Sequence, residues 1–155
     1  MNTYYTLIQS LKTIFESDDA VSTVVTGDTS EVDVYRKNIF PLVHVLVTDS
    51  PYIGNNTSVV RYNVEITVVD IRDINKDQLL DKFWTNDNRH DNWNTTRSIL
   101  KLAQDKITKD SLDNDVTLVT SSAAIPQIYS GENLLDGWVQ TWTIDVPDLL
   151  TDSCA

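Results

Sequence analysis

The sequence contains very little cysteine, histidine and glycine, and these scarcities exclude several classes of protein. Its one cysteine, Cys154, cannot form an internal disulfide, so a small domain held together by disulfides is excluded. The two histidines, His44 and His90, leave few members for a nucleophile–base–acid triad. Four glycines in 155 residues form no glycine-rich loop that could cradle a phosphate. We therefore expect no catalytic residues and no cofactor.

Positive charge is also scarce. The chain has 12 lysine and arginine residues against 23 aspartate and glutamate residues, which gives a formal net charge of -11. The longest basic run is the pair Arg36-Lys37. Because so acidic a surface repels a phosphate backbone, we do not expect this chain to read the sequence of a nucleic acid.

Long hydrophobic runs are missing as well. No stretch approaches the roughly 20 apolar residues that span a bilayer, and the N-terminus lacks the basic stretch and apolar core of a secretion signal. Hydrophobic residues still make up 41% of the chain, which is enough to build a core at this length. We expect one domain over residues 1–155, with no membrane contact and with residues 148–155 as an extended tail.

Hydrophobic periodicity predicts two helices and a strand pair. Apolar residues at spacings of three and four predict a helix over residues 3–16, with Tyr4 on its buried stripe, and a second helix over 93–107. A nearly continuous apolar run from Ile39 to Thr48 predicts a strand buried on both faces. Strict alternation over residues 59–71 predicts its antiparallel partner.

Shorter patterns predict the remaining strands. They are "AVSTVV" early in the chain, "DVTLVT", a short edge strand within "AIPQIYSGENLLDG", and "WVQTWTIDV", which Pro147 ends. Three long polar loops are expected at residues 49–58, 72–92 and 121–137. The order of these elements predicts an α+β fold, with a mainly antiparallel sheet and two helices packed on one face.

The polar cluster "DNRHDNWN" at residues 87–94 has the composition of a metal or catalytic site. Zinc ligands recur at spacings such as H-x3-H, and a calcium loop of the EF-hand type needs alternating aspartates, a central glycine and a final glutamate. Neither pattern is present. Because the helical pattern begins at Trp93, we interpret Asp91 or Asn92 as the N-cap of the helix, with a weak cation site as the alternative. The sequence thus predicts no metal site.

Carboxylates and aromatic residues leave two alternative functions open. The pairs Asp70/Asp73 and Glu132/Asp136 have the residue types of glycosidase acids, so a small acidic enzyme that uses loop carboxylates is one alternative. The second is a monomeric binding module that presents Trp84 and Tyr129 to a ligand. The other tryptophans, which are Trp93, Trp138 and Trp142, fall on apolar faces and are expected in the core. His44 is expected to be a hydrogen-bonded residue of the core or of an interface.

Four segments resemble one family. They are "VYRKNIFPLVHVLVTDS", "VVRYNVEITVVDIRDIN", "NWNTTRSILKLAQDKI" and the closing "TWTIDVPDLLTDSC". In this order they resemble the neck and tail terminator (tail completion) proteins of tailed bacteriophages, including crAss-like and other short-tailed phages. An "IFPLvHi"-like strand, a long alternating strand that ends in D-I-x-D and a helix that starts near W-N follow one another in that family. The resemblance covers the chain from about Val34 to its C-terminus.

The resemblance implies a tail-terminator-like fold and a structural virion protein without enzymatic activity, made in the cytoplasm of a bacterial host. Such a protein forms a homo-oligomeric ring of six or twelve subunits, as a head-tail connector or tail terminator. The ring contacts other neck, portal and tail proteins and leaves a channel through which DNA passes. Subunit contacts are then expected in the three polar loops, with these candidates: Pro51, Tyr52, Ile53, Phe83, Trp84, Tyr129, Leu134 and Leu135.

Overall fold

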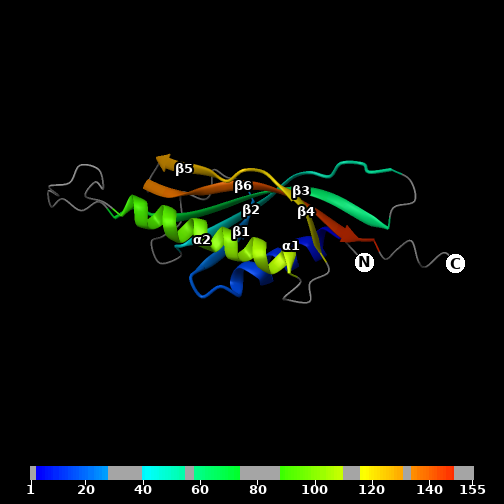
Figure 1. Cartoon of the computed structure of the whole chain (residues 1–155), viewed down its shortest axis with the longest axis horizontal. Coiled ribbons are helices and arrows are strands. Elements are labelled where there is room, and N and C mark those ends of the chain that lie inside the picture. The colour runs from blue at the N-terminus through cyan, green and yellow to red at the C-terminus, as the bar shows by residue number, and fades with distance from the viewer. Residues whose placement is uncertain are drawn as a thin grey trace.

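The computed structural model describes residues 3–27, 40–54, 58–73, 88–109, 116–130 and 134–148. Within these residues the chain forms an α+β fold of two helices and a six-stranded, mostly antiparallel sheet (Figure 1). In chain order the elements are α1 (Thr3–Glu16), β1 (Thr23–Thr26), β2 (Leu42–Asp49), β3 (Val59–Ile71), α2 (Arg89–Thr108), β4 (Thr117–Ser121), β5 (Ile125–Ser130) and β6 (Leu134–Pro147). Neither of these two helices is long and apolar enough to cross a membrane.

The strand order of the sheet is β1-β2-β3-β6-β4, and β5 also pairs with β6. The predicted hairpin of β2 and β3 is confirmed, and the β1–β2 pair is the one parallel pair among the described strands. The long strands β3 and β6 run antiparallel along their whole length and form the centre of the sheet. β4 and β5 pair with opposite halves of β6, so that together they form one edge.

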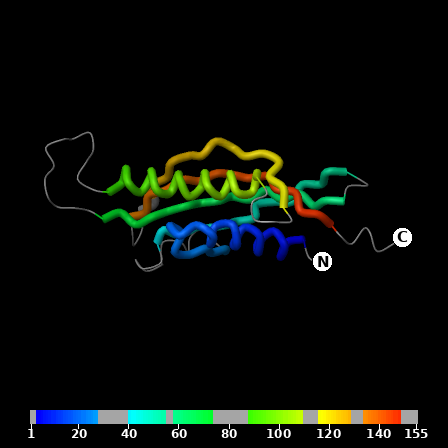
Figure 2. The backbone as a smooth tube through the Cα atoms, turned by 60° about the horizontal axis from the view of Figure 1, so that its bottom comes forward, coloured from blue at the N-terminus to red at the C-terminus, as the bar shows by residue number. Residues whose placement is uncertain are grey.

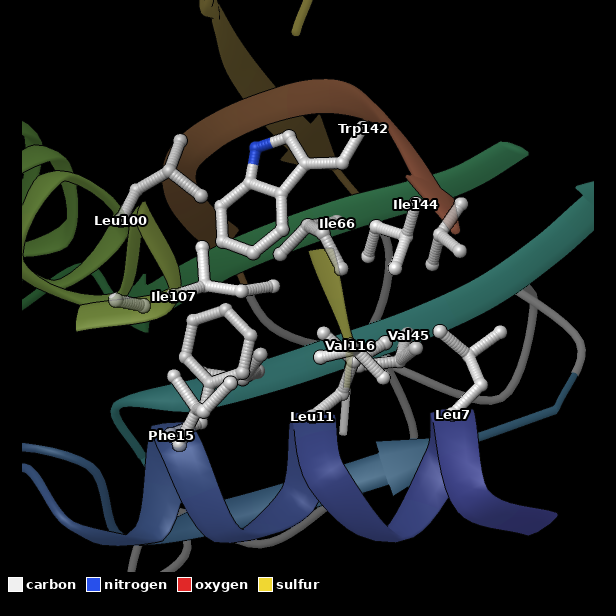
Figure 3. Close-up of a cluster of buried hydrophobic side chains, with 14 of the residues drawn as sticks. Leu7, Leu11, Phe15, Val45, Ile66, Leu100, Ile107, Val116, Trp142 and Ile144 are labelled. Atoms are coloured by element: carbon white, nitrogen blue, oxygen red, sulfur yellow. The ribbon is translucent and has the colours of Figure 1, made fainter. Parts of the chain in front are cut away.

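Both helices cover the same face of the sheet, as the sequence predicts. Buried side chains of α1 and α2 share one hydrophobic cluster with the inward side chains of β2, β3 and β6. Figure 3 shows Leu7, Leu11 and Phe15 of α1 pointing at this face of the sheet. Trp142 of β6 is completely buried there and stacks on Phe15, with ring centroids 5.9 Å apart. Each such large side chain contributes about 1.5–3 kcal/mol to stability when it leaves water.

The opposite face of the sheet carries a smaller buried cluster of Phe40, Leu42, Val69 and Leu135. This second cluster explains why the first half of β2 is apolar without alternation, since its side chains are buried on both faces. Gly137 lies in β6 directly opposite Val69, and a Cβ atom there would stand 1.9 Å from the carbonyl oxygen of Val68. Glycine is therefore required for the two central strands to approach this closely.

Several element boundaries differ from those predicted. α2 begins at Arg89, one turn before Trp93, because its first turn is polar and does not follow the hydrophobic period. β6 begins at Leu134, so much of the predicted loop at 121–137 is strand. The sequence did not predict this start of β6, because Asp136 and Gly137 are residue types that are uncommon in strands. Tyr4, expected on the buried stripe of α1, is exposed, because the stripe narrows to residues 7, 11, 14 and 15.

Candidate functional site

The polar cluster that looked like a metal site lies mostly inside α2, where it attaches the helix to the sheet. The predicted N-cap at Asp91 or Asn92 is wrong, because Asn88 occupies that position and makes no side-chain cap bond to the helix. Its Oδ1 instead accepts a hydrogen bond from the Asp73 amide at 2.7 Å. Asn92 is buried, and its Nδ2 donates to the Ile71 carbonyl at 3.0 Å. These amides bind the end of β3 beneath the first turn of α2.

A buried carboxylate lies next to these amides. Asp136 of β6 is completely buried and accepts two hydrogen bonds from the guanidinium of Arg72, one of them from Nε at 2.9 Å. The Nδ2 of Asn92 is 3.4 Å from the same carboxylate. A buried charge is tolerated when it is paired and hydrogen-bonded in this way.

Asp70 lies directly opposite Asp136 on the neighbouring strand β3. Burial raises the pKa of the Asp70 carboxyl, the hydrogen bond from the Ile71 amide lowers it, and the facing Asp136 carboxylate raises it again, with a net rise above the ordinary value of 3.8. A carboxyl with a raised pKa is a common component of a general acid.

The predicted carboxylate pairs are not the pairs that the structure forms. Asp70 faces Asp136 and not Asp73, while Glu132 lies outside the described residues. Because Asp136 has no exposed surface and is held by Arg72, it cannot contact a substrate. In the described part of the chain, no group of three or more His, Cys, Asp or Glu side chains could hold a metal ion. The cluster therefore serves as a polar anchor between β3, β6 and α2.

His44 is a core residue, as the sequence predicts. It is buried on β2 opposite Thr67, and its Nε2 donates a hydrogen bond to the Gly27 carbonyl at 2.8 Å. A carbonyl only accepts hydrogen bonds, so Nε2 carries a proton in this contact. This bond connects β2 to the end of β1.

A row of arginine and tryptophan side chains follows α2 along the sheet edge. The Arg89 guanidinium lies 5.4 Å from the ring centre of Trp93, and that of Arg97 lies 6.0 Å from Trp138. The indole of Trp93 donates to the Gln127 carbonyl of β5 at 3.3 Å, and that of Trp138 donates to the Trp93 carbonyl at 2.9 Å. Both tryptophans are half-buried, less than predicted; Trp93 connects α2 to β5 and Trp138 connects α2 to β6.

Exposed hydrophobic side chains form two groups within the described residues. We call Tyr4, Tyr5 and Tyr52 the tyrosine group; Tyr52 has 79% and Tyr5 has 70% of its surface exposed. We call Leu102, Val119, Ile125 and Ile128 the aliphatic group, which belongs to α2, β4 and β5. Ile125 and Ile128 lie opposite Val139 and Asp136 of β6, so their side chains point to opposite faces of the sheet. The exposed residues of the two groups are the candidate contact residues of the chain.

The structure separates the predicted contact residues. Pro51 and Tyr52 are exposed and Ile53 is half-buried, all in the connection between β2 and β3. Leu134 is half-buried, but Leu135 is completely buried in the smaller cluster, so we no longer regard it as a contact residue. Phe83 and Trp84 lie outside the described residues, as does the side chain of Tyr129, whose backbone pairs with Leu135.

The aliphatic group was missed by the sequence reasoning, although one signal was available. Leu102 lies off the stripe of α2 that is formed by residues 99, 100, 103 and 107, and an apolar residue off the stripe indicates a second contact. Val119, Ile125 and Ile128 give no such signal, since their exposure depends on which strand lies at the edge.

Comparisons with protein-family models and with curated proteins find no match to this chain.

Proposed function

We propose that this chain is a structural virion protein that forms a ring in the neck or tail of a tailed bacteriophage. As a head-tail connector or tail terminator, the ring joins the portal side to the tail and leaves a channel for DNA. The observation that carries the proposal is the presence of two exposed apolar groups on different elements, one at the β2–β3 connection and α1, the other along α2, β4 and β5. A ring subunit needs two unlike surfaces, one for each neighbour.

The sequence resemblance supports the same function. The segments that carry it include all of β2 and β3, most of α2 and the second half of β6. The fold of this chain, a mainly antiparallel sheet with two helices on one face, is the fold that the order of its elements predicts, and it is compatible with a ring subunit. The net charge of -11 is compatible with a channel wall that repels DNA and lets it slide.

The first experiment measures the mass of the purified chain in solution. Multi-angle light scattering at several concentrations, combined with negative-stain images of any large species, should show rings of six or twelve copies of the 17.5 kDa chain. Hydrogen exchange would then show the segment at Pro51, Tyr52 and Ile53 protected in the ring and unprotected in the dissociated subunit. A single 17.5 kDa species at every concentration, without rings on the grids, would contradict self-assembly.

A carboxylate enzyme is the second candidate, and the raised pKa of Asp70 is the observation in its favour. The complete burial of its neighbour Asp136 argues against a paired acid and base at this position. Screening glycoside hydrolysis with the wild-type chain and with Asp70→Asn separates the two functions. Turnover that depends on Asp70 would favour the enzyme, whereas a chain that assembles with Asn at this position supports the structural protein.

A further inference from the structure

The two edges of the sheet differ in charge on the side that the helices cover. The strand order places β1 at one edge and β4 and β5 at the other. An acidic turn at residues 16–19, with Glu16, Asp18 and Asp19, precedes β1, and the row of arginine and tryptophan side chains on α2 lies against β5. We propose that the acidic turn of one copy docks on this row in the next copy, with an ion pair between Asp19 and Arg97.

This inference rests on the proposed function, because a closed ring repeats one contact between two unlike surfaces of the subunit. It adds to that function the identity of the two surfaces and their partner, a second copy of this chain. Figure 2 shows α1, in blue, and β5, in yellow and orange, on opposite sides of α2. Surfaces at opposite edges of one sheet can contact two neighbours at the same time, as a ring requires.

Arg97 is a cation without a carboxylate. Its guanidinium lies 6.0 Å from the ring centre of Trp138, and its Nη1 is buried without a hydrogen-bond partner. Within the described part of the chain, the Arg97 side chain forms no ion pair and no hydrogen bond. The side chain is half-buried, so part of it remains open to another molecule. Stacking on an indole holds a guanidinium in place and leaves its planar N–H groups for a carboxylate.

The elements around Arg97 supply no carboxylate to it. β4 and β5 contain no acidic residue, and residues 89–98 of α2 contain two arginines and one acid, Asp91. Asp136 of β6 is completely buried and already paired with Arg72. Although the chain has a net charge of -11, these elements leave the row short of acids. Charge complementarity therefore favours an acidic partner for the row.

The acidic turn lies at the end of α1 where negative charge is unfavourable. Glu16 is the last residue of α1, and the helix has no basic residue in its last turn. Because the C-terminal end of a helix carries a partial negative charge, carboxylates there do not stabilise it. Asp18 has a local role, since its Oδ1 accepts a hydrogen bond from the Ala20 amide at 3.0 Å.

Two lysines lie near this turn, but neither pairs with Asp19. Lys12 lies 3.8 Å from Glu16, and Lys106 of α2 donates to the Ser17 hydroxyl at 2.7 Å. Asp19 is exposed, and its side chain forms no ion pair or hydrogen bond with the described residues. One edge of the sheet thus carries an unpaired acid, and the opposite edge carries the unpaired cation of α2.

These charges specify a head-to-tail contact. Two acidic turns, or two rows of arginine and tryptophan, would bring like charges together, which disfavours a symmetric dimer. Ile128 adds apolar surface beside the row, since it lies opposite Asp136 on the face of the sheet that α2 covers and is 47% exposed. An exposed ion pair alone contributes little to affinity, so Asp19 and Arg97 chiefly determine which surfaces pair.

The test exchanges the two charges. Asp19→Lys brings a lysine to Arg97 of the neighbour, and Arg97→Glu brings a glutamate to Asp19, so each variant alone should associate about tenfold more weakly than the wild type. The double variant Asp19→Lys/Arg97→Glu restores opposite charges and should associate within about threefold of the wild type. An equal mixture of the two single variants should assemble as well, because every contact between unlike copies joins opposite charges.

Matched controls separate this contact from a general effect of charge. Glu65→Lys makes the same change in net charge as Asp19→Lys, but on the central strand β3, where Glu65 shares the face of Val69 away from the helices. Asp19→Glu keeps the carboxylate, and both controls should assemble like the wild type. Circular dichroism and urea unfolding check that every variant is folded, and Arg97→Gln, which removes only the cation, replaces Arg97→Glu if that variant is not. Light scattering over a dilution series and negative-stain images give the readout.

Each outcome either supports the inference or overturns it. Single variants that associate like the wild type, or a double variant and a mixture that do not recover, overturn the contact between Asp19 and Arg97 and leave the ring proposal intact. A loss with Glu65→Lys as large as that with Asp19→Lys overturns the contact in the same way. Recovery by the double variant together with filaments that never close supports the contact and contradicts the ring. A wild-type chain that stays monomeric at every concentration overturns both.

Discussion

Asp70 and Asp136 face each other across the β3–β6 pair, and Arg72, which directly follows the last residue of β3, forms a bidentate ion pair with Asp136. Arg72 thus provides a cation for the completely buried Asp136 carboxylate. Burial raises the pKa of the facing Asp70 carboxyl, and the neighbouring Asp136 carboxylate raises it further.

Asp70→Asn should change how stability depends on pH. A raised pKa in the folded state means that the folded chain binds more protons than the unfolded chain between the ordinary value of 3.8 and the higher folded value. The contribution of Asp70 to the free energy of unfolding is therefore fully present below pH 3.8 and is lost as the pH rises through the folded pKa. Asparagine does not titrate, so the variant does not lose stability at this position as the pH rises. The melting temperature of the variant, relative to wild type, should rise from pH 3 to pH 7, and an unchanged difference over this range would contradict a raised pKa.

Arg72→Met should be strongly destabilising, because it leaves the Asp136 carboxylate buried without its cation and facing Asp70. Removing one partner of a buried ion pair costs about 3–5 kcal/mol. The double variant Arg72→Met/Asp136→Leu removes both charges and should lose less stability than Arg72→Met alone. Urea unfolding of the wild type, Arg72→Met, Asp136→Leu and the double variant at pH 7 measures this, and a double variant whose loss equals the sum of the two single losses would show that the pair is not coupled.

The polar anchor around Asp136 shows which features of the fold the sequence can predict and which it cannot. Periodicity located both helices and the β2–β3 hairpin, because it depends on which side chains of a single element face the core. Arg72 and Asp136 are 64 residues apart, and their pairing depends on the register between β3 and β6, which no local pattern reports. The same holds for the aliphatic group, since residues such as Ile128 are exposed only because β5 is an edge strand. The exposure of Tyr52 could be predicted, in contrast, because this residue lies in a polar connection that the local sequence already marks as a loop.

Substituting alanine for Gly137 or for Gly54 should destabilise the fold in both cases, but for different reasons. Gly137→Ala places a Cβ atom 1.9 Å from the Val68 carbonyl oxygen in the centre of the sheet, so the strands must separate, at a cost of about 3 kcal/mol or more. Gly54 has φ +112° and open space around its Cα, so Gly54→Ala meets only backbone strain, about 1–2 kcal/mol. Denaturant unfolding should therefore rank Gly137→Ala as the more damaging variant. Equal losses would mean that β6 can shift away from β3 at little cost.

The last prediction concerns the polar cluster at the start of α2, where two asparagines form a matched pair. Asn92 is buried and donates to the Ile71 carbonyl, whereas Asn94, two residues further along the helix, is exposed. Asn92→Ala removes the 3.0 Å hydrogen bond to the Ile71 carbonyl, which keeps the longer one from Asn88 Nδ2 at 3.5 Å, and it removes a donor from the Asp136 carboxylate. This loss should cost about 1–3 kcal/mol. Asn94→Ala should stay within about 0.5 kcal/mol of wild type. Urea unfolding at pH 7 compares the two variants. A structural anchor requires Asn92→Ala to lose clearly more stability than Asn94→Ala, so equal losses would contradict this role of Asn92.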